Sequence, residues 1–225
     1  MTEEAAAMCP ESPRGYLELA WVYQHDYVLG NTKSPRETLE KSIELAQKAL
    51  AMDDSNAAGH SLLGVCYAHK GDPDKAIAEG ERALALNPGD VYNLLNYASC
   101  LNLFAGRPEE AIPLFQKAIR LTPFGPSSLY REFGHALRNT GRYEEAVPAY
   151  KKAIQIAPDN VYAHLGLAAT YSLMGREREA RAEAAEVLRI NPKFSLDHYR
   201  ALTSIYKDQS LRDRIVDALR KAGLK

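Results

Sequence analysis

Hydrophobic and polar positions in the middle of the chain follow helical spacing. In the segment 59–88, apolar or small residues recur every three or four positions, stop at Gly71 and resume until Asn87 and Pro88. Gly71 suits the left-handed conformation that ends a helix, Asp72 can cap the next helix, and Pro73 fits its first turn. The residue before a proline avoids helical geometry, so the second run ends at Asn87. The pattern predicts two helices joined by a short turn.

This helical hairpin is repeated along the chain. Glycines at the turn recur at intervals of 35, 35 and 34 residues, and the prolines that end the second helices keep the same intervals: Gly71, Gly106, Gly141 and Gly175; Pro88, Pro123, Pro158 and Pro192. Small residues share the register and predict close approach of the two helices: Gly64, Ala98, Gly134 and Ala168. Such a period predicts stacked repeats.

The flanks depart from the period. In the first unit about ten extra residues lengthen the first helix past Val28 or form a loop, with Ser34 capping and Pro35 opening the second helix. The third unit has one extra residue, predicted in its turn near Ala105, and the fourth begins with an insertion at 124–126. Beyond Pro192 the period breaks but helical spacing continues, which predicts a cap at the end of the stack.

These residues resemble the tetratricopeptide repeat (TPR), in the second unit at His60, Leu63, Gly64, Tyr67, Ala76, Ala83 and Pro88, with Gly80 departing from the usual aromatic residue. The fourth unit is similar at Tyr130, Phe133, Gly134, Leu137, Ala146, Tyr150, Ala153 and Pro158. The resemblance implies an all-α, right-handed superhelix, an α-solenoid whose first helices line a concave groove for a peptide. It divides the chain into a start that is disordered or added for expression (1–12), an atypical first repeat (13–56), four repeats (57–90, 91–126, 127–160 and 161–194) and a C-terminal helical cap (195–225).

A wider resemblance covers residues from about Tyr16 to Leu224. The first unit with its extended turn and the ending at 186–199 are similar to the C-terminal TPR region of bacterial class III adenylate and guanylate cyclases and of related TPR regulators. Neither a cyclase domain nor a winged helix is present in this sequence. The resemblance therefore implies the role of a sensor or interaction arm.

Charge and composition narrow the class of partner. The 28 Lys and Arg residues balance 29 Asp and Glu residues, so no whole-molecule field attracts nucleic acid or anionic lipid, and a protein or peptide is the expected partner. Apolar stretches stay short of the roughly 20 residues that span a bilayer. Glu3 and Glu4 stand where an export signal is basic, and three widely spaced cysteines suit a reducing compartment, so we expect a cytoplasmic protein.

The sequence contains no recognisable reaction centre. It has no phosphate-binding glycine loop, no G-x-S-x-G and no H-E-x-x-H, and its histidines do not fall at the spacing of metal ligands. His60 and His164 occupy equivalent packing sites and are interpreted as structural, and Cys66 and Cys100 as inert buried thiols. We therefore expect no enzyme activity, cofactor or metal.

The candidate binding residues are those that the TPR resemblance places on the groove. Arg131, His135 and Arg138 form one stripe of a helix that can hold an acidic partner segment, or a solvated face partly neutralised by Glu132. Trp21 is an aromatic anchor or core filler. The full predicted groove set is Trp21, Gln24, His69, Tyr92, Asn96, Asn102, Arg131, His135, Arg138 and Tyr162.

The sequence thus favours a non-catalytic scaffold that binds a partner peptide or helix. Two alternatives stay open: a module for homo-oligomerisation, and a regulatory arm of a larger cyclase or transcriptional regulator.

Overall fold

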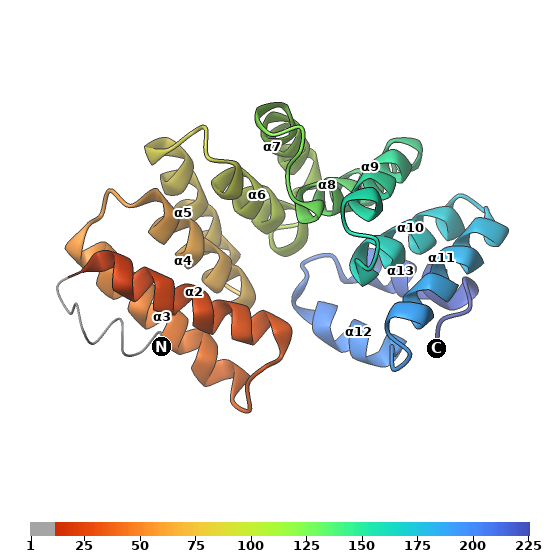
Figure 1. Ribbon diagram of the computed structural model, residues 1–225, viewed down its shortest axis with the longest axis horizontal. Helices are drawn as coiled ribbons and strands as arrows, with labels where there is room; N and C mark the ends of the chain where they lie inside the picture. Colours follow the sequence, from red (N-terminus) through yellow and green to blue (C-terminus); the bar gives the residue numbers. More distant parts are fainter. Residues whose placement is uncertain (1–11) are drawn as a thin grey trace. The chain divides into compact units, whose positions relative to one another are not determined.

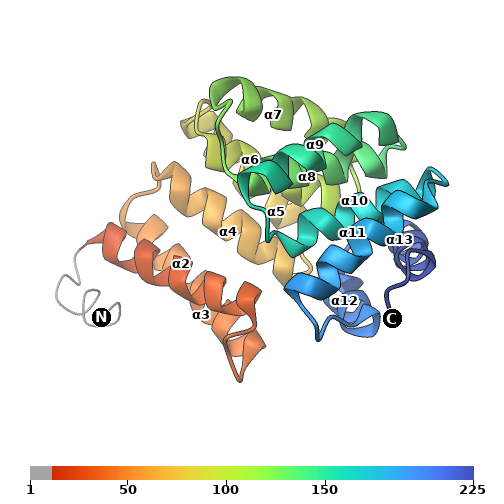
Figure 2. The same cartoon turned by 45° about the vertical axis from the view of Figure 1, so that its right-hand side comes forward.

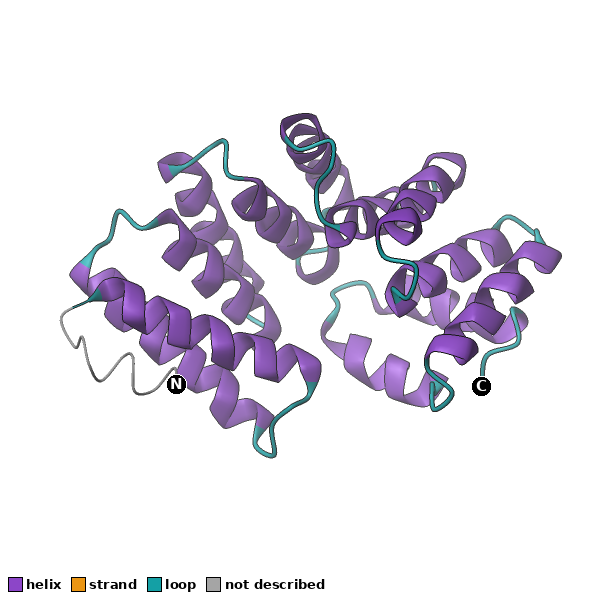
Figure 3. Ribbon diagram, viewed as in Figure 1, coloured by secondary structure: helices purple, strands orange, loops and turns teal. Residues whose placement is uncertain are grey.

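The computed structural model describes residues 12–225, and every regular element in this range is helical (Figure 3). Cys9 and the predicted disordered start, apart from Ser12, lie outside the described residues. The chain divides into two compact units, Met1–Cys100 and Leu101–Lys225. Each unit is considered separately below.

The first unit consists of two helical hairpins followed by a single helix (Figure 1). The second helix of one hairpin packs on the first helix of the next, and the first helices α2, α4 and α6 also contact one another in order. This is the arrangement of stacked repeats. The helices are α2 (Pro13–Leu29), α3 (Pro35–Met52), α4 (Ala57–Lys70), α5 (Pro73–Leu86) and α6 (Val91–Ser99).

The second unit continues the pattern with two complete hairpins and ends in a different arrangement. Helices α8 and α9 form one hairpin, α10 and α11 the next, and α13 packs on α10 and α11. These elements can be followed in Figure 2. Their bounds are α7 (Pro108–Leu121), α8 (Ser127–Asn139), α9 (Tyr143–Ile156), α10 (Val161–Leu173), α11 (Glu177–Ile190), α12 (Leu196–Leu202), the 3₁₀ turn η2 (Thr203–Ile205) and α13 (Gln209–Lys221).

The predicted turn glycines are confirmed by their backbone angles. Gly71, Gly106, Gly141 and Gly175 have φ of 87°, 68°, 77° and 74°, in the left-handed region that favours glycine. The cap is also confirmed after Gly71, where the Asp72 carboxylate accepts a hydrogen bond from the backbone N–H of Lys75. Local sequence therefore sets where each hairpin turns.

Two details of the connections differ from the predictions. The extra residue of the third unit is not in the turn at Ala105, because the helix widens into a π-helical turn, η1 (Cys100–Phe104), that absorbs it. In the first unit both proposed solutions occur, since α2 extends to Leu29 and a loop follows it. The prediction that the Ser34 side chain caps α3 is wrong: Ser34 holds the N-cap position without a side-chain bond, and its carbonyl accepts from the Thr38 hydroxyl instead.

Small residues bring the helices together as predicted. A Cβ atom built on Gly64 would lie 3.1 Å from the carbonyl oxygen of Ala76 in the partner helix. Gly80, which departs from the usual aromatic residue, faces the ring of Tyr97, and a Cβ there would lie 2.9 Å from the Tyr97 Cγ. The aromatic ring at this site thus comes from the following helix.

Candidate functional site

The first-helix face of the first unit is formed by α2, α4 and α6. Hydrogen bonds and ring contacts join these helices side by side: the Asn96 amide donates to the Ser61 hydroxyl over 3.0 Å, and the rings of Tyr27 and His69 meet edge to face at 5.3 Å. Burial lowers the pKa of His69, while its bond to the Val65 carbonyl acts in the opposite direction. His69 is therefore a neutral group on this face at pH 7.

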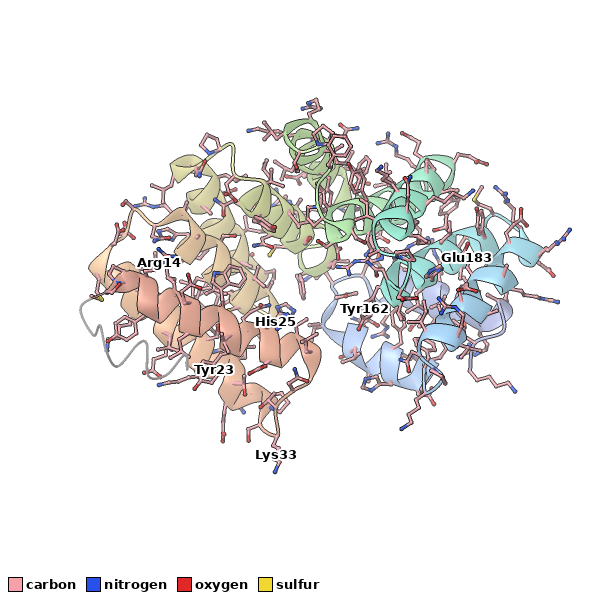
Figure 4. The ribbon with its side chains drawn as sticks, in the orientation of Figure 1. Arg14, Tyr23, His25, Lys33, Tyr162 and Glu183 are labelled. Atoms are coloured by element: carbon pink, nitrogen blue, oxygen red, sulfur yellow. The ribbon has the colours of Figure 1, made fainter. Side chains whose placement is uncertain are left out.

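The predicted groove residues of the first unit differ in exposure. Tyr92 is 63% exposed, and Asn96 and His69 are half-buried. Gln24 is buried, and Trp21 packs against the apolar core between α2, α3 and α4, which favours its interpretation as core filler. Tyr92 is the exposed member of the predicted set in this unit, and Trp21 is half-buried like Asn96 and His69. His25 of α2 is labelled in Figure 4.

The first-helix face of the second unit is formed by η1, α8 and α10. Its elements carry the other five predicted residues: Asn102, Arg131, His135, Arg138 and Tyr162. Asn139 links two of them, because its side chain donates to Asn102 Oδ1 over 2.9 Å and accepts from Arg138 Nη2 over 3.2 Å. The Arg131 guanidinium lies 5.7 Å from the centre of the Tyr162 ring, a cation–π contact. Tyr162 is labelled in Figure 4.

The charged stripe of α8 is a partly internal network. Arg131 Nη2 lies 2.6 Å from Glu132 Oε1, and His135 Nδ1 lies 3.3 Å from Glu132 Oε2. Burial opposes ionisation of Glu132, but Arg131 and His135 outweigh it and hold the Glu132 pKa far below its usual range. Burial lowers the pKa of His135, so this ring is neutral at pH 7. The sequence indicated that Glu132 neutralises part of the stripe, but not that Glu132 is buried.

Sequence reasoning also missed a C-terminal segment that folds back onto η1. We use the term C-terminal cover for residues 196–207, which comprise α12, η2 and the start of the connection to α13 (Figure 1). The backbone N–H of Lys207 donates to the Leu103 carbonyl over 2.9 Å, and the rings of Tyr206 and Phe104 meet edge to face at 5.6 Å. The segment predicted as a cap therefore has two parts: α13 packs at the end of the hairpins, and the cover reaches back to η1.

The charges of α8 act on two tyrosines of the cover. Burial raises the pKa of Tyr199, and the charge of Arg138 opposes that rise. Burial likewise raises the pKa of Tyr206, against the effect of Arg131. Both tyrosines are therefore neutral over the ordinary pH range. No feature of the sequence except the loss of the repeat period at Pro192 pointed to this arrangement.

His60 and His164 make matching contacts inside their hairpins. Nδ1 of each ring lies 2.6 Å from a carboxylate oxygen, of Glu79 and Glu183 respectively. Nε2 lies 3.0 Å and 2.9 Å from a backbone carbonyl oxygen in the preceding turn. These contacts join the first helix to the second, which agrees with a structural role.

Neither a metal centre nor a membrane span emerges from the described residues. Within residues 12–225, no group of three or more His, Cys, Asp or Glu side chains could hold a metal ion. No helix in that range has the length and apolarity needed to cross a bilayer.

Comparisons with known proteins agree with this architecture. Family models match two segments: "Tetratricopeptide repeat" at residues 37–91 and "TPR repeat" at residues 134–175. No curated protein matches the chain.

Solved structures resemble the chain along most of its length. PilW, a type IV pilus biogenesis factor, has a TM-score of 0.72 at 18% identity, covering 93% of this chain and 90% of PilW. A thermophilic TPR protein of Thermus thermophilus has a TM-score of 0.67 at 21% identity, covering 93% of this chain and 100% of its own. YrrB, described as a TPR protein with an unusual peptide-binding site, has a TM-score of 0.58 at 20% identity, covering 90% and 95%. The chain therefore has the all-helical fold of tetratricopeptide repeat proteins, with a matching repeat segment in each of its two units.

Proposed function

We propose that this chain is a non-catalytic scaffold that binds a peptide or helix of a protein partner on the first-helix face of the first unit. TPR proteins generally mediate protein–protein interaction, and the similar structure of YrrB is described as having a peptide-binding site. The observation that carries the proposal is the exposure of Tyr92, at 63%, beside the half-buried Asn96. A tyrosine in this setting offers apolar area and a hydroxyl to a partner at a low entropy cost.

The chemistry of the face suits a short segment of mixed character. Tyr92 supplies the apolar contact, and the Asn96 amide and neutral His69 ring supply polar selection. Asn96 already bonds Ser61 on the adjacent helix, which fixes its side chain before a partner arrives. A preorganised polar group loses less entropy on binding than a free one.

Site-specific photocrosslinking in the full chain tests this proposal. A benzophenone amino acid placed at Tyr92 should crosslink one or a few proteins of the source cell, and excess unlabelled chain should suppress the crosslinks. The matched control is Leu86, which is 38% exposed on the second helix of the preceding hairpin. The same products from both positions, or none from position 92, would contradict the proposal.

Self-association is a second candidate, favoured by one apolar spot on the second unit. Phe124 is 93% exposed in the connection before α8, next in the chain to the region of Leu121, which is 51% exposed. Neighbouring exposed apolar side chains that form one patch mark contacts between proteins. Light scattering over a range of concentrations should show a dimer that Phe124→Ser abolishes, whereas an unchanged dimer would exclude this contact.

A more specific version of the scaffold proposal is that this chain is the regulatory arm of a larger cyclase or transcriptional regulator. It is supported by the sequence resemblance to the C-terminal TPR region of class III cyclases and related regulators. The reading frame around the gene tests it: a catalytic or DNA-binding domain encoded in frame would support the arm, and its absence would remove this version.

A further inference from the structure

We propose that the second unit contains a binding site for a peptide carboxylate at Arg138 and Asn102, closed by the C-terminal cover, and that an acidic peptide displaces the cover to reach it. The inference goes beyond the proposed function, which concerns the first unit, and neither depends on the other. It rests on an unpaired buried charge, an unpartnered amide and a weakly held cover.

Arg138 is a buried cation that lacks a counter-ion. It is 4% exposed, and within residues 12–225 it forms no ion pair. Its Nη2 donates to the Asn139 side chain over 3.2 Å, while its Nε has no hydrogen-bond partner. A buried guanidinium without a carboxylate is costly to the folded chain. A ligand carboxylate would relieve that cost.

The carboxylate of Glu132 is not the counter-ion of Arg138. Glu132 binds Arg131 through Oε1 and His135 through Oε2, so both of its oxygens are engaged. With His135 neutral, the cluster of Arg131, Glu132, His135 and Arg138 carries a net charge of about +1 at pH 7. The missing charge is therefore negative.

A second donor without an acceptor lies on the same bonded chain. Asn102 is 4% exposed, its Oδ1 accepts from Asn139, and its Nδ2 has no partner. Asn139 thus connects the unpartnered amide of Asn102 to the unpartnered Nε of Arg138. Buried polar groups are nearly always hydrogen-bonded, so two free donors in one network point to a ligand that only accepts. A carboxylate has that property and matches the fork of a guanidinium.

The cover can open at a low cost compared with the repeats. In the segment 196–207 Leu196 and Thr203 are buried and Tyr199 and Tyr206 are half-buried, whereas Leu202 and Ile205 are 52% and 38% exposed. It contacts η1 through the Lys207–Leu103 backbone bond and the Tyr206–Phe104 ring pair. At its other end, the Leu196 N–H donates to the Lys225 carbonyl and Arg200 pairs with Asp213 of α13. Segments with few buried side chains open locally without unfolding the whole domain. A peptide that binds only the open state therefore shifts the population toward it.

An acidic peptide is the occupant that the charge favours. The site offers one uncompensated positive charge and two hydrogen-bond donors without acceptors. Aspartate or glutamate side chains in an extended segment meet both conditions. A free inorganic anion shares the chemistry, and it is tested separately with sulfate.

The experiment measures binding of fluorescein-labelled hexaglutamate to the full chain by anisotropy at low salt. Arg138→Gln should weaken binding by about tenfold or more, the factor that one charge-assisted hydrogen bond supplies. The matched control is Arg142→Gln, which removes an exposed arginine paired with Glu145 and should change binding less than about twofold. Equal effects of the two changes would overturn the proposal.

Hydrogen exchange is measured on the wild-type chain, so its result does not depend on whether the Arg138→Gln variant folds. On addition of hexaglutamate to the wild-type chain, the amide of Lys207 should exchange faster because its bond to Leu103 breaks. Tyr206→Ala should tighten binding, since it loosens the cover, whereas Ser204→Ala, an exposed neighbour, should not. Binding without faster exchange at Lys207, or faster exchange with sodium sulfate alone at equal ionic strength, would refute displacement by a peptide.

Discussion

Gly166 of α10 lies against the ring of Tyr150, and the effect of one added methyl group there follows from the packing. Tyr150 projects from α9 and is fully buried. A Cβ atom on Gly166 would lie 2.6 Å from Tyr150 Cζ, well inside van der Waals contact. The ring cannot move away, because a Cβ on Gly134 of α8 would lie only 2.9 Å from its Cε1. Gly166→Ala therefore overpacks a closed site.

Two opposing effects set the magnitude. Overpacking a well-packed core costs about 1–3 kcal/mol, and the lack of free space around the ring places this site near the upper value. Alanine also stabilises a helix interior by about 1 kcal/mol relative to glycine. The net loss should be about 2 kcal/mol, which lowers the melting temperature by about 4–8 °C for a chain of this size.

Urea unfolding followed by circular dichroism measures this loss, and a double-mutant cycle assigns it to the ring. With Tyr150→Leu as background, the ring atoms are absent and Gly166→Ala should become stabilising by about 1 kcal/mol. Gly89→Ala is the control, since a Cβ there meets no atom within 4 Å. If Gly166→Ala costs nothing, or costs the same with leucine at position 150, the packing argument fails.

Three further predictions concern other contacts. The bond to Glu183 raises the pKa of His164 in the folded chain, so this bond stabilises the fold fully below about pH 6.5 and loses its effect as pH rises through that raised pKa. The difference in melting temperature between wild type and His164→Gln should therefore shrink from pH 5 to pH 9. A constant difference would contradict this prediction. Burial raises the pKa of Cys66 to about 11 and of Cys100 to about 12, so mass spectrometry should find neither labelled by a thiol reagent at pH 8 until urea is added, and labelling in the native chain would show the burial to be wrong. Asn160→Ala should cost about 1–2 kcal/mol, because its side chain accepts from the Ala163 N–H and donates to Ser127; unchanged stability in urea would count against both bonds.

Much of the fold could be predicted because its signals are local. Gly71 and its equivalents require positive φ, the prolines end helices, and the small residues mark close helix approach; each depends on a few neighbouring positions. The exceptions are also informative. The extra residue of the third unit entered η1 as a π-helical turn, and a count of residues between markers cannot distinguish a wider helix from a longer turn.

The candidate site could be predicted only in part. The repeat register predicted that Asn102, Arg131, His135, Arg138 and Tyr162 share one face of the second unit. Contacts join Asn102 to Arg138 through Asn139, and Arg131 to Tyr162. The repeat register does not predict how exposed these side chains are. Glu132 is buried beneath the stripe, and Arg138 is 4% exposed where the sequence suggested a groove arginine. The role of these residues in partner binding stays a prediction.

The sequence by itself determined the hairpins, their turns and their order, because helical periodicity and glycine conformation act over a few residues. Only the tertiary structure decided which surfaces of those hairpins are covered. Lys207 and Leu103 are in contact although several helices separate them in the sequence. Such a contact forms where a segment outside the repeats can bury apolar surface and satisfy its backbone N–H groups. That long-range choice, and not the repeat, brings Tyr199 and Tyr206 near the charges of α8.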